Sequence, residues 1–179
     1  MEQPNSTSGL GIIRIEGTAT IPAGQEVKVL DTVISDNLKR DEIFQHWRGQ
    51  VINNSLFVEE RLDWTINKIL PKDSPYKIIN LSFKKKSVLL RELLSTIESF
   101  KAEDFFQLFN DLDKVINVRN KFAHGQVSYS GMQGEKIFLT SFKEISKKEE
   151  VTENTIIAFI EICAKCRQEL DKIMQLAQT

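Results

Sequence analysis

The sequence predicts an all-α domain, an antiparallel up-and-down helical bundle of four to five helices with a small β-hairpin before the last helix. Apolar residues recur at spacings of three and four over four long stretches, the pattern of helices that bury one face. The connections between these stretches are short, as in a bundle of neighbouring helices. With 179 residues, 41% of them hydrophobic, the chain is long enough for one well-buried core.

Residues 1–34 differ from the rest of the chain in composition. They are rich in Gly, Ser and Thr, and several glycines and one proline separate short apolar pieces. Residues 12–15 and 27–33 could each form a short strand, but nothing in the pattern requires it. We therefore expect an irregular or extended arm over residues 1–34 and one helical domain over residues 35–179.

The first two helices are expected over residues 35–70 and 84–100. Ser35 or Asp36 can cap the first, the Asn53-Asn54-Ser55 run can break it into two, and Pro71 ends it. Ser82 can cap the second helix, which has a Leu-rich apolar side.

A third helix is expected over residues 103–124, where the apolar stripe is most regular. Gly125 then ends it, because glycine readily takes the left-handed conformation just after a helix. Two β-prone pieces, 127–130 and 136–142, flank the glycine-rich run 131–134 and predict the hairpin. The last helix is expected over residues 153–178, with Thr152 as its cap.

Composition and cysteine usage narrow the function classes. The 24 basic and 25 acidic side chains nearly cancel, so any contact with nucleic acid must come from a local patch. Cys163 and Cys166 lie three apart on an apolar helix without a second cysteine pair, which favours two core residues in a reducing compartment over a zinc or redox site. We expect no metal, no cofactor, no membrane span and a cytoplasmic location.

One segment concentrates polar side chains suited to catalysis. Arg119 continues the apolar stripe by one turn, Asn120 lies one turn before His124, and no cluster of metal-ligand residues accompanies them. Arginine can pair with a phosphate, histidine can transfer a proton, and the negative end of the helix dipole favours an imidazolium at His124. For RNA, attack of the 2'-hydroxyl on its own phosphodiester requires no metal in principle. That reaction needs a base and an acid, and two chains meeting at this segment would supply two histidines.

This segment also carries a family resemblance. Residues 115–125 read VINVRNKFAHG, which resembles the Arg-x4-6-His signature of the HEPN superfamily, including the polar residue after the arginine. The Glu59-Glu60-Arg61-Leu62 run, the Leu81-Ser82-Phe83 entry and this motif are together similar to the mannitol-repressor-like branch, over roughly residues 45–177. Some toxin members place a tyrosine two residues after the histidine, where this chain has Gln126.

The resemblance implies a helical dimer with the two motifs facing one cleft and, in many members, metal-independent RNA cleavage in toxin or antiviral defence roles. Arg119, Asn120 and His124 would be the catalytic residues, and Glu59 or Glu60 would pair with Arg119. RNA or a nucleotide phosphate would be the ligand. A cognate antitoxin or a regulator would be the protein partner. Two alternatives stay open: a non-catalytic regulator or nucleotide-binding module of mannitol-repressor type, and a purely structural dimerisation domain.

Overall fold

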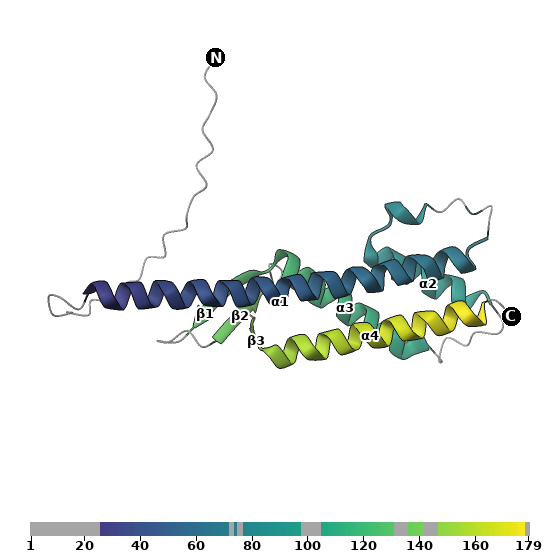
Figure 1. Cartoon of the computed structure of the whole chain (residues 1–179). Helices are drawn as coiled ribbons and strands as arrows, with labels where there is room; N and C mark the ends of the chain where they lie inside the picture. The colour runs from purple at the N-terminus through teal and green to yellow at the C-terminus, as the bar shows by residue number, and fades with distance from the viewer. Residues whose placement is uncertain are drawn as a thin grey trace, which may run out of the picture.

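The chain is mostly helical, with a small antiparallel sheet before the last helix (Figure 1). The computed structural model describes residues 26–71, 74, 77–97, 105–130, 136–141 and 147–177, and only the backbone over residues 26–37. In chain order the elements are α1 (Glu26–Ile69), η1 (Ile78–Asn80), α2 (Phe83–Ser95), α3 (Phe106–His124), β1 (Gln126–Ser130), β2 (Lys136–Thr140), β3 (Lys148–Val151) and α4 (Glu153–Leu176).

Helix α1 is longer than the sequence pattern predicts. It already begins at Glu26, so the expectation of an arm up to residue 34 is wrong for residues 26–34, and residues 1–25 lie outside the described part. The expected break at residues 53–55 is also absent. Asn54 Nδ2 donates to the Gln50 carbonyl at 2.9 Å and Ser55 Oγ donates to the Ile52 carbonyl at 2.7 Å. These polar side chains bond to their own helix instead of competing with it.

The expected caps of α2 and α4 are both confirmed. Ser82 Oγ accepts from the Lys85 backbone N–H at 3.4 Å, at the start of α2. Thr152 accepts from the Thr155 backbone N–H at 3.3 Å, and the Thr155 hydroxyl accepts from the Thr152 N–H, which completes a capping box. Helix α1 ends two residues before Pro71, as the proline predicts.

The sheet contains the expected hairpin and one further strand. β1 pairs antiparallel with β2, with Val127 opposite Leu139, whereas the turn at residues 131–135 lies outside the described residues. β2 pairs antiparallel with β3, which the sequence analysis missed. β3 reads Lys-Glu-Glu-Val, and only Val151 is buried. It has no alternating apolar pattern because it is an edge strand whose charged side chains face solvent.

The helices do not alternate strictly in direction. Arg167 lies over the Phe57 ring and Arg61 pairs with Asp171, so contacts between α1 and α4 advance together along both helices. α1 and α4 therefore run in the same direction, and α3 returns between them (Figure 1). The reason is the sheet, which lies at the end of the bundle where α3 finishes, so α4 starts again from that end.

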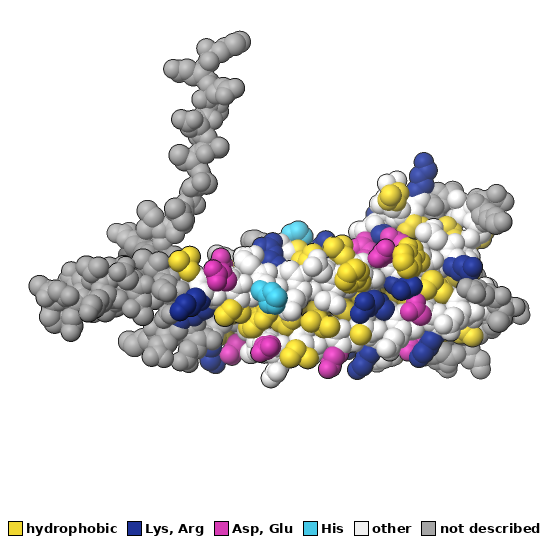
Figure 2. All heavy atoms as spheres, viewed as in Figure 1, with side chains coloured by type: hydrophobic (Ala, Val, Ile, Leu, Met, Phe, Trp, Pro, Cys, Tyr) yellow, Lys and Arg dark blue, Asp and Glu magenta, His cyan; other side chains and the backbone are white. Residues whose placement is uncertain are grey.

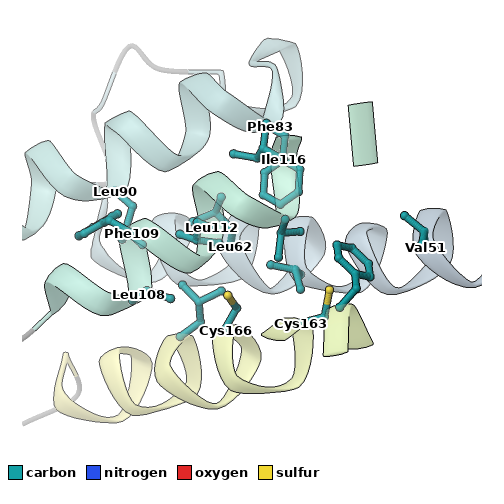
Figure 3. Close-up of a cluster of buried hydrophobic side chains, with 14 of the residues drawn as sticks. Val51, Leu62, Phe83, Leu90, Leu108, Phe109, Leu112, Ile116, Cys163 and Cys166 are labelled. Atoms are coloured by element: carbon teal, nitrogen blue, oxygen red, sulfur yellow. The ribbon is translucent and has the colours of Figure 1, made fainter. Parts of the chain in front are cut away.

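One hydrophobic core joins the four helices and the sheet, and Figure 3 shows its central part. Leu62, Leu90, Leu112 and Leu170 are fully buried. Cys163 and Cys166 project from α4 into this cluster with 0% and 1% of their surface exposed, which confirms that they are core residues. Burial raises the pKa of both thiols to about 12, so the reactive thiolate is disfavoured at neutral pH.

We expect the two cysteines to contribute packing and nothing else. Replacing both by alanine should lower the free energy of unfolding by about 1 to 3 kcal/mol, because small cavities replace two buried sulfur atoms. Urea denaturation of the wild type and the double variant measures this loss. Zinc at one equivalent per chain in the purified wild-type protein would contradict the interpretation.

Candidate functional site

The motif residues occupy the last turns of α3, directly before β1. His124 is the final residue of the helix and is exposed, as is Asn120, whereas Arg119 is partly buried. Arg119 Nη1 donates to Asn120 Oδ1 at 3.1 Å, so the guanidinium lies beside the amide. Within the described part of the chain, that amide is the only hydrogen-bond partner found for the guanidinium. Asn120 and His124 are one turn apart, so all three groups lie near one end of one helix.

Helix α1 holds this end of α3 in place. The Phe44 ring stacks on the Phe122 ring, with centroids 5.8 Å apart and planes at 13°. One turn further along α1, Arg48 Nη2 donates to the Ala123 carbonyl at 3.0 Å. That carbonyl is one of those that a helix end leaves without an intrahelical donor, so Arg48 caps α3 next to His124.

Arg48 is therefore a site residue that the sequence analysis missed. It is partly buried and lies 75 residues before Ala123 in the chain. The only sequence signal is its position one turn after the buried Phe44 and three residues before the buried Val51, which places a cation at the edge of the apolar face of α1. Nothing in the sequence says which helix that edge meets.

Gly125 ends α3, but not in the left-handed conformation that the sequence analysis expected. It is the C-cap residue, with φ −72° and ψ 159°, which is extended backbone that any residue adopts. Close packing requires the glycine instead. A β-carbon here would lie 3.0 Å from Leu139 Cδ1 and from the Thr140 carbonyl oxygen, and closer still to the Lys121 carbonyl oxygen. The chain can thus pass directly from His124 into β1 against strand β2.

The sheet adds two polar contacts beside the motif. Lys121 Nζ pairs with Glu149 Oε1 of β3 at 2.6 Å. The Tyr129 hydroxyl donates to Asp41 Oδ1 of α1 at 3.0 Å. Burial and then the hydrogen bond to Asp41 raise the pKa of Tyr129 to about 12, so the tyrosine stays neutral at physiological pH. The tyrosine therefore serves here as a hydrogen-bond donor that ties β1 to α1.

The two acidic residues expected to pair with Arg119 lie elsewhere in the single chain. Glu59 Oε1 accepts from Lys86 Nζ of α2 at 2.9 Å, and Asp63 Oδ2 accepts from the same ammonium at 2.8 Å. Glu60 is exposed. No ion pair joins Glu59 or Glu60 to Arg119 among the described residues. The expected ion pair with Arg119 is therefore not formed within the described part of the chain. On this face of α1 the buried Lys86 of α2 takes the place of the arginine.

Lys86 belongs to the lysine run 84–86 at the start of α2, where positive charge is unfavourable for the helix dipole. Only 7% of its side chain is exposed. Burial by itself lowers the pKa of the ammonium, but the hydrogen bonds and charges of Asp63 and Glu59 outweigh it, so the pKa of Lys86 lies above its usual value. Lys84 pairs with Asp113 of α3 at 2.5 Å. Two of the three lysines thus join helices.

His46 lies on a different side of α1 from the residues that contact the motif. It lines a groove with Trp47 and Glu153, on the side of α1 that faces α4, whereas Phe44 and Arg48 face α3. Both histidines lie on the face of the molecule shown in Figure 2 and are exposed. A single chain therefore contributes one histidine, His124, to the end of α3.

The comparisons with known proteins identify no family for this chain. No family model matches the chain, and no match is found among the curated proteins or the solved structures. Among the described residues, no group of three or more His, Cys, Asp and Glu side chains is arranged to hold a metal ion. None of the described helices is both long enough and apolar enough to cross a membrane. The polar residues at the end of α3 are therefore the candidate functional site.

Proposed function

We propose that this protein is a metal-independent endoribonuclease of the HEPN type, active as a homodimer. The observation that carries the proposal is the arrangement at the end of α3, where an arginine, an amide and an exposed histidine lie together. Arg48 holds the last turn from α1 and brings a second guanidinium to the same place. The two arginines supply the local positive patch that a chain of nearly zero net charge needs for RNA.

The chemistry assigned to the site is transesterification. The RNA 2'-oxygen attacks the neighbouring phosphorus while its proton passes to a base, and the bond from phosphorus to the 5'-oxygen breaks as that oxygen takes a proton from an acid. The products are a 2',3'-cyclic phosphate and a 5'-hydroxyl. Arg119 stabilises the charge that develops on the phosphorane, Asn120 fixes geometry, and His124 transfers the proton.

The dimer follows from the need for both a base and an acid. One chain offers His124 alone at this site, and isologous twofold dimers are the commonest small oligomers. We therefore propose that two chains bring their Arg119 and His124 residues into one cleft. In this arrangement the second histidine comes from the partner chain.

We expect the protein to be a dimer in light scattering at micromolar concentration. An Asn120→Cys variant should form an intermolecular disulfide under mild oxidation, because Asn120 would lie close to its counterpart across the twofold axis. The matched control is Glu161→Cys, an exposed position on α4. A monomer, or equal cross-linking of both variants, would contradict the shared cleft.

The proposed activity is tested with a panel of single-stranded RNAs in the presence of EDTA. We expect cleavage, 2',3'-cyclic phosphate ends and no reaction on DNA or on RNA with a 2'-deoxy residue at the cut site. Loss of cleavage in EDTA, or cleavage of DNA, would contradict the mechanism.

The proposal has a biological part as well. It includes a toxin or defence role, a cognate antitoxin and a cytoplasmic location. Expression in cells with and without a candidate neutralising partner would test the toxin role.

A non-catalytic function is the second candidate, and one observation favours it. The Arg119 guanidinium already bonds Asn120, and the single chain has one histidine at the site, an arrangement that can hold a phosphate without cleaving a bond. In this case the protein is a nucleotide-binding or regulatory module, as in the mannitol-repressor-like branch. Thermal stabilisation by nucleotides, without turnover of any RNA, would support it.

A further inference from the structure

A second surface, far from the motif, combines apolar side chains with acids. It is an open groove of about 620 Å³ between the end of α1 and η1. Phe57 and Trp64 of α1 are half exposed, and Ile79 of η1 is 88% exposed. Glu60 and Asp63 line the same groove. Figure 2 shows acidic side chains among hydrophobic ones where α1 passes η1.

Some acceptors in the groove have no hydrogen-bond donor. Asp63 Oδ2 bonds Lys86, but Asp63 Oδ1 is buried and has no hydrogen-bond partner. Among the described residues, no ion pair or hydrogen bond engages the Glu60 carboxylate. An unpaired buried carboxylate oxygen is costly, so a donor entering the groove would be favoured. With Glu59, Asp63 and Glu60 facing only Lys86, the groove carries a net negative charge.

The neighbouring arginines do not fill this role. The Arg61 guanidinium lies 4.7 Å from the Trp64 ring centre and pairs with Asp171 of α4 at 3.2 Å. Arg167 of α4 lies over the Phe57 ring. Arg61 of α1 and Arg167 of α4 thus pack on the aromatic rings, and among the described residues neither guanidinium bonds the groove acids.

We propose that the groove binds the N-terminal segment Ile12-Ile13-Arg14-Ile15 of a second copy of the chain. The chemistry of the segment matches the groove, because it presents one guanidinium between isoleucines. Arg14 would donate to the Glu60 carboxylate and to Asp63 Oδ1, and a planar guanidinium suits paired carboxylate oxygens. The isoleucines would cover the exposed surfaces of Phe57, Trp64 and Ile79.

The length of the chain favours a segment from another copy. Glu60 lies 34 residues after Glu26 on one continuous helix, a distance of about 51 Å at roughly 1.5 Å per residue. Arg14 precedes Glu26 by only 12 residues, which span at most about 43 Å when fully extended. Arg14 therefore meets Glu60 of its own chain only if the segment and both side chains are fully extended, which is entropically costly, whereas the segment of a second copy needs no such extension. Reciprocal exchange of two such segments closes a twofold dimer. The inference rests on the self-association proposed above and not on RNA cleavage.

Charge exchange in the full-length protein tests the pairing. Arg14→Glu and Glu60→Arg should each raise the dimer dissociation constant by about tenfold or more, measured by sedimentation over a dilution series. The double variant restores an opposite-charge pair and should recover most of the affinity. The matched control is Glu161→Arg, on an exposed face of α4, which should leave the constant unchanged. Single variants without effect, or a double variant no better than either single one, would overturn the proposal.

Cross-linking separates exchange between chains from binding within one chain. A chain with Ile13→Cys, mixed with a chain carrying Ile79→Cys, should form a disulfide-linked pair under mild oxidation. The natural cysteines are buried and should not compete. The same mixture with Glu161→Cys in place of Ile79→Cys is the control. The proposal is wrong if the yield of disulfide-linked pairs does not exceed that of this control. It is also wrong if a chain that carries both cysteines forms an internal disulfide as a monomer. Neither assay reads RNA cleavage, so an inactive ribonuclease would leave the result unchanged.

Discussion

Replacing His124 by alanine should lower the rate of RNA cleavage by about 10²- to 10⁴-fold, the usual contribution of a general acid or base. His124 is exposed at the end of α3 and makes no hydrogen bond to any described residue, so its loss should leave the fold intact. Single-turnover cleavage of one labelled RNA, with EDTA present, measures the rate. Circular dichroism and thermal unfolding of the same samples establish that the variant is folded.

His46→Ala is the matched control for this experiment. It removes the other histidine of the chain, which is also exposed on a helix but lines the groove beside Glu153 instead of the motif. Its cleavage rate should stay within about twofold of the wild type, because no general acid or base is removed. Equal cleavage by wild type and His124→Ala would refute the ribonuclease proposal and favour the binding module.

Arg119→Ala becomes a second informative probe. If Arg119 paired with an acidic residue, as the family resemblance implies, its removal would leave that carboxylate unpaired and destabilise the protein. In the structure the guanidinium bonds the neutral Asn120 amide instead. The stability of Arg119→Ala should therefore stay within about 0.5 kcal/mol of the wild type, while the cleavage rate falls.

The largest effect on stability is expected at Lys86. Lys86→Met should lower the free energy of unfolding by about 2 to 4 kcal/mol, since Glu59 and Asp63 lose their shared cation. The value lies between those of surface pairs and fully buried pairs, because the two carboxylates are 22% and 28% exposed. For a chain of this length the melting temperature should fall by roughly 5 to 15 °C, measured by calorimetry.

Two variants isolate the cause of that loss. Lys84→Met removes the exposed pair with Asp113 from the same lysine run and should cost less than about 1 kcal/mol. Adding Glu59→Gln and Asp63→Asn to Lys86→Met should recover much of the stability, because no unpaired charge remains. If Lys84→Met and Lys86→Met destabilise equally, burial of the ammonium has no special role.

The raised pKa of Lys86 also sets a direction for pH dependence. A base whose pKa is higher in the folded state binds its proton more tightly there, so its contribution to stability is complete below its unfolded pKa of about 10.5. That contribution is lost as the pH rises through the higher folded pKa. Wild type should therefore lose more stability than Lys86→Met above about pH 10.5 in alkaline urea titrations.

Several local features and the position of the motif could be predicted from the sequence alone. Helix caps at Ser82 and Thr152, the stop at Pro71 and the hairpin from β1 to β2 are all set by residues within a few positions of one another. The spacing of Arg119, Asn120 and His124 depends only on helix geometry, so it could be read before any fold was known.

Contacts between residues far apart in the sequence could not be predicted, because they depend on how the helices pack. Glu59 and Arg119 are 60 positions apart, and whether they pair depends on how α1, α2 and α3 pack; Lys86 takes the carboxylate instead. Likewise Arg48 reaches Ala123 only because Phe44 and Phe122 stack, and β3 forms because β2 offers a free edge. Charged side chains have no periodicity that identifies a distant partner, since their pairing is fixed by the apolar faces that bury the helices against each other.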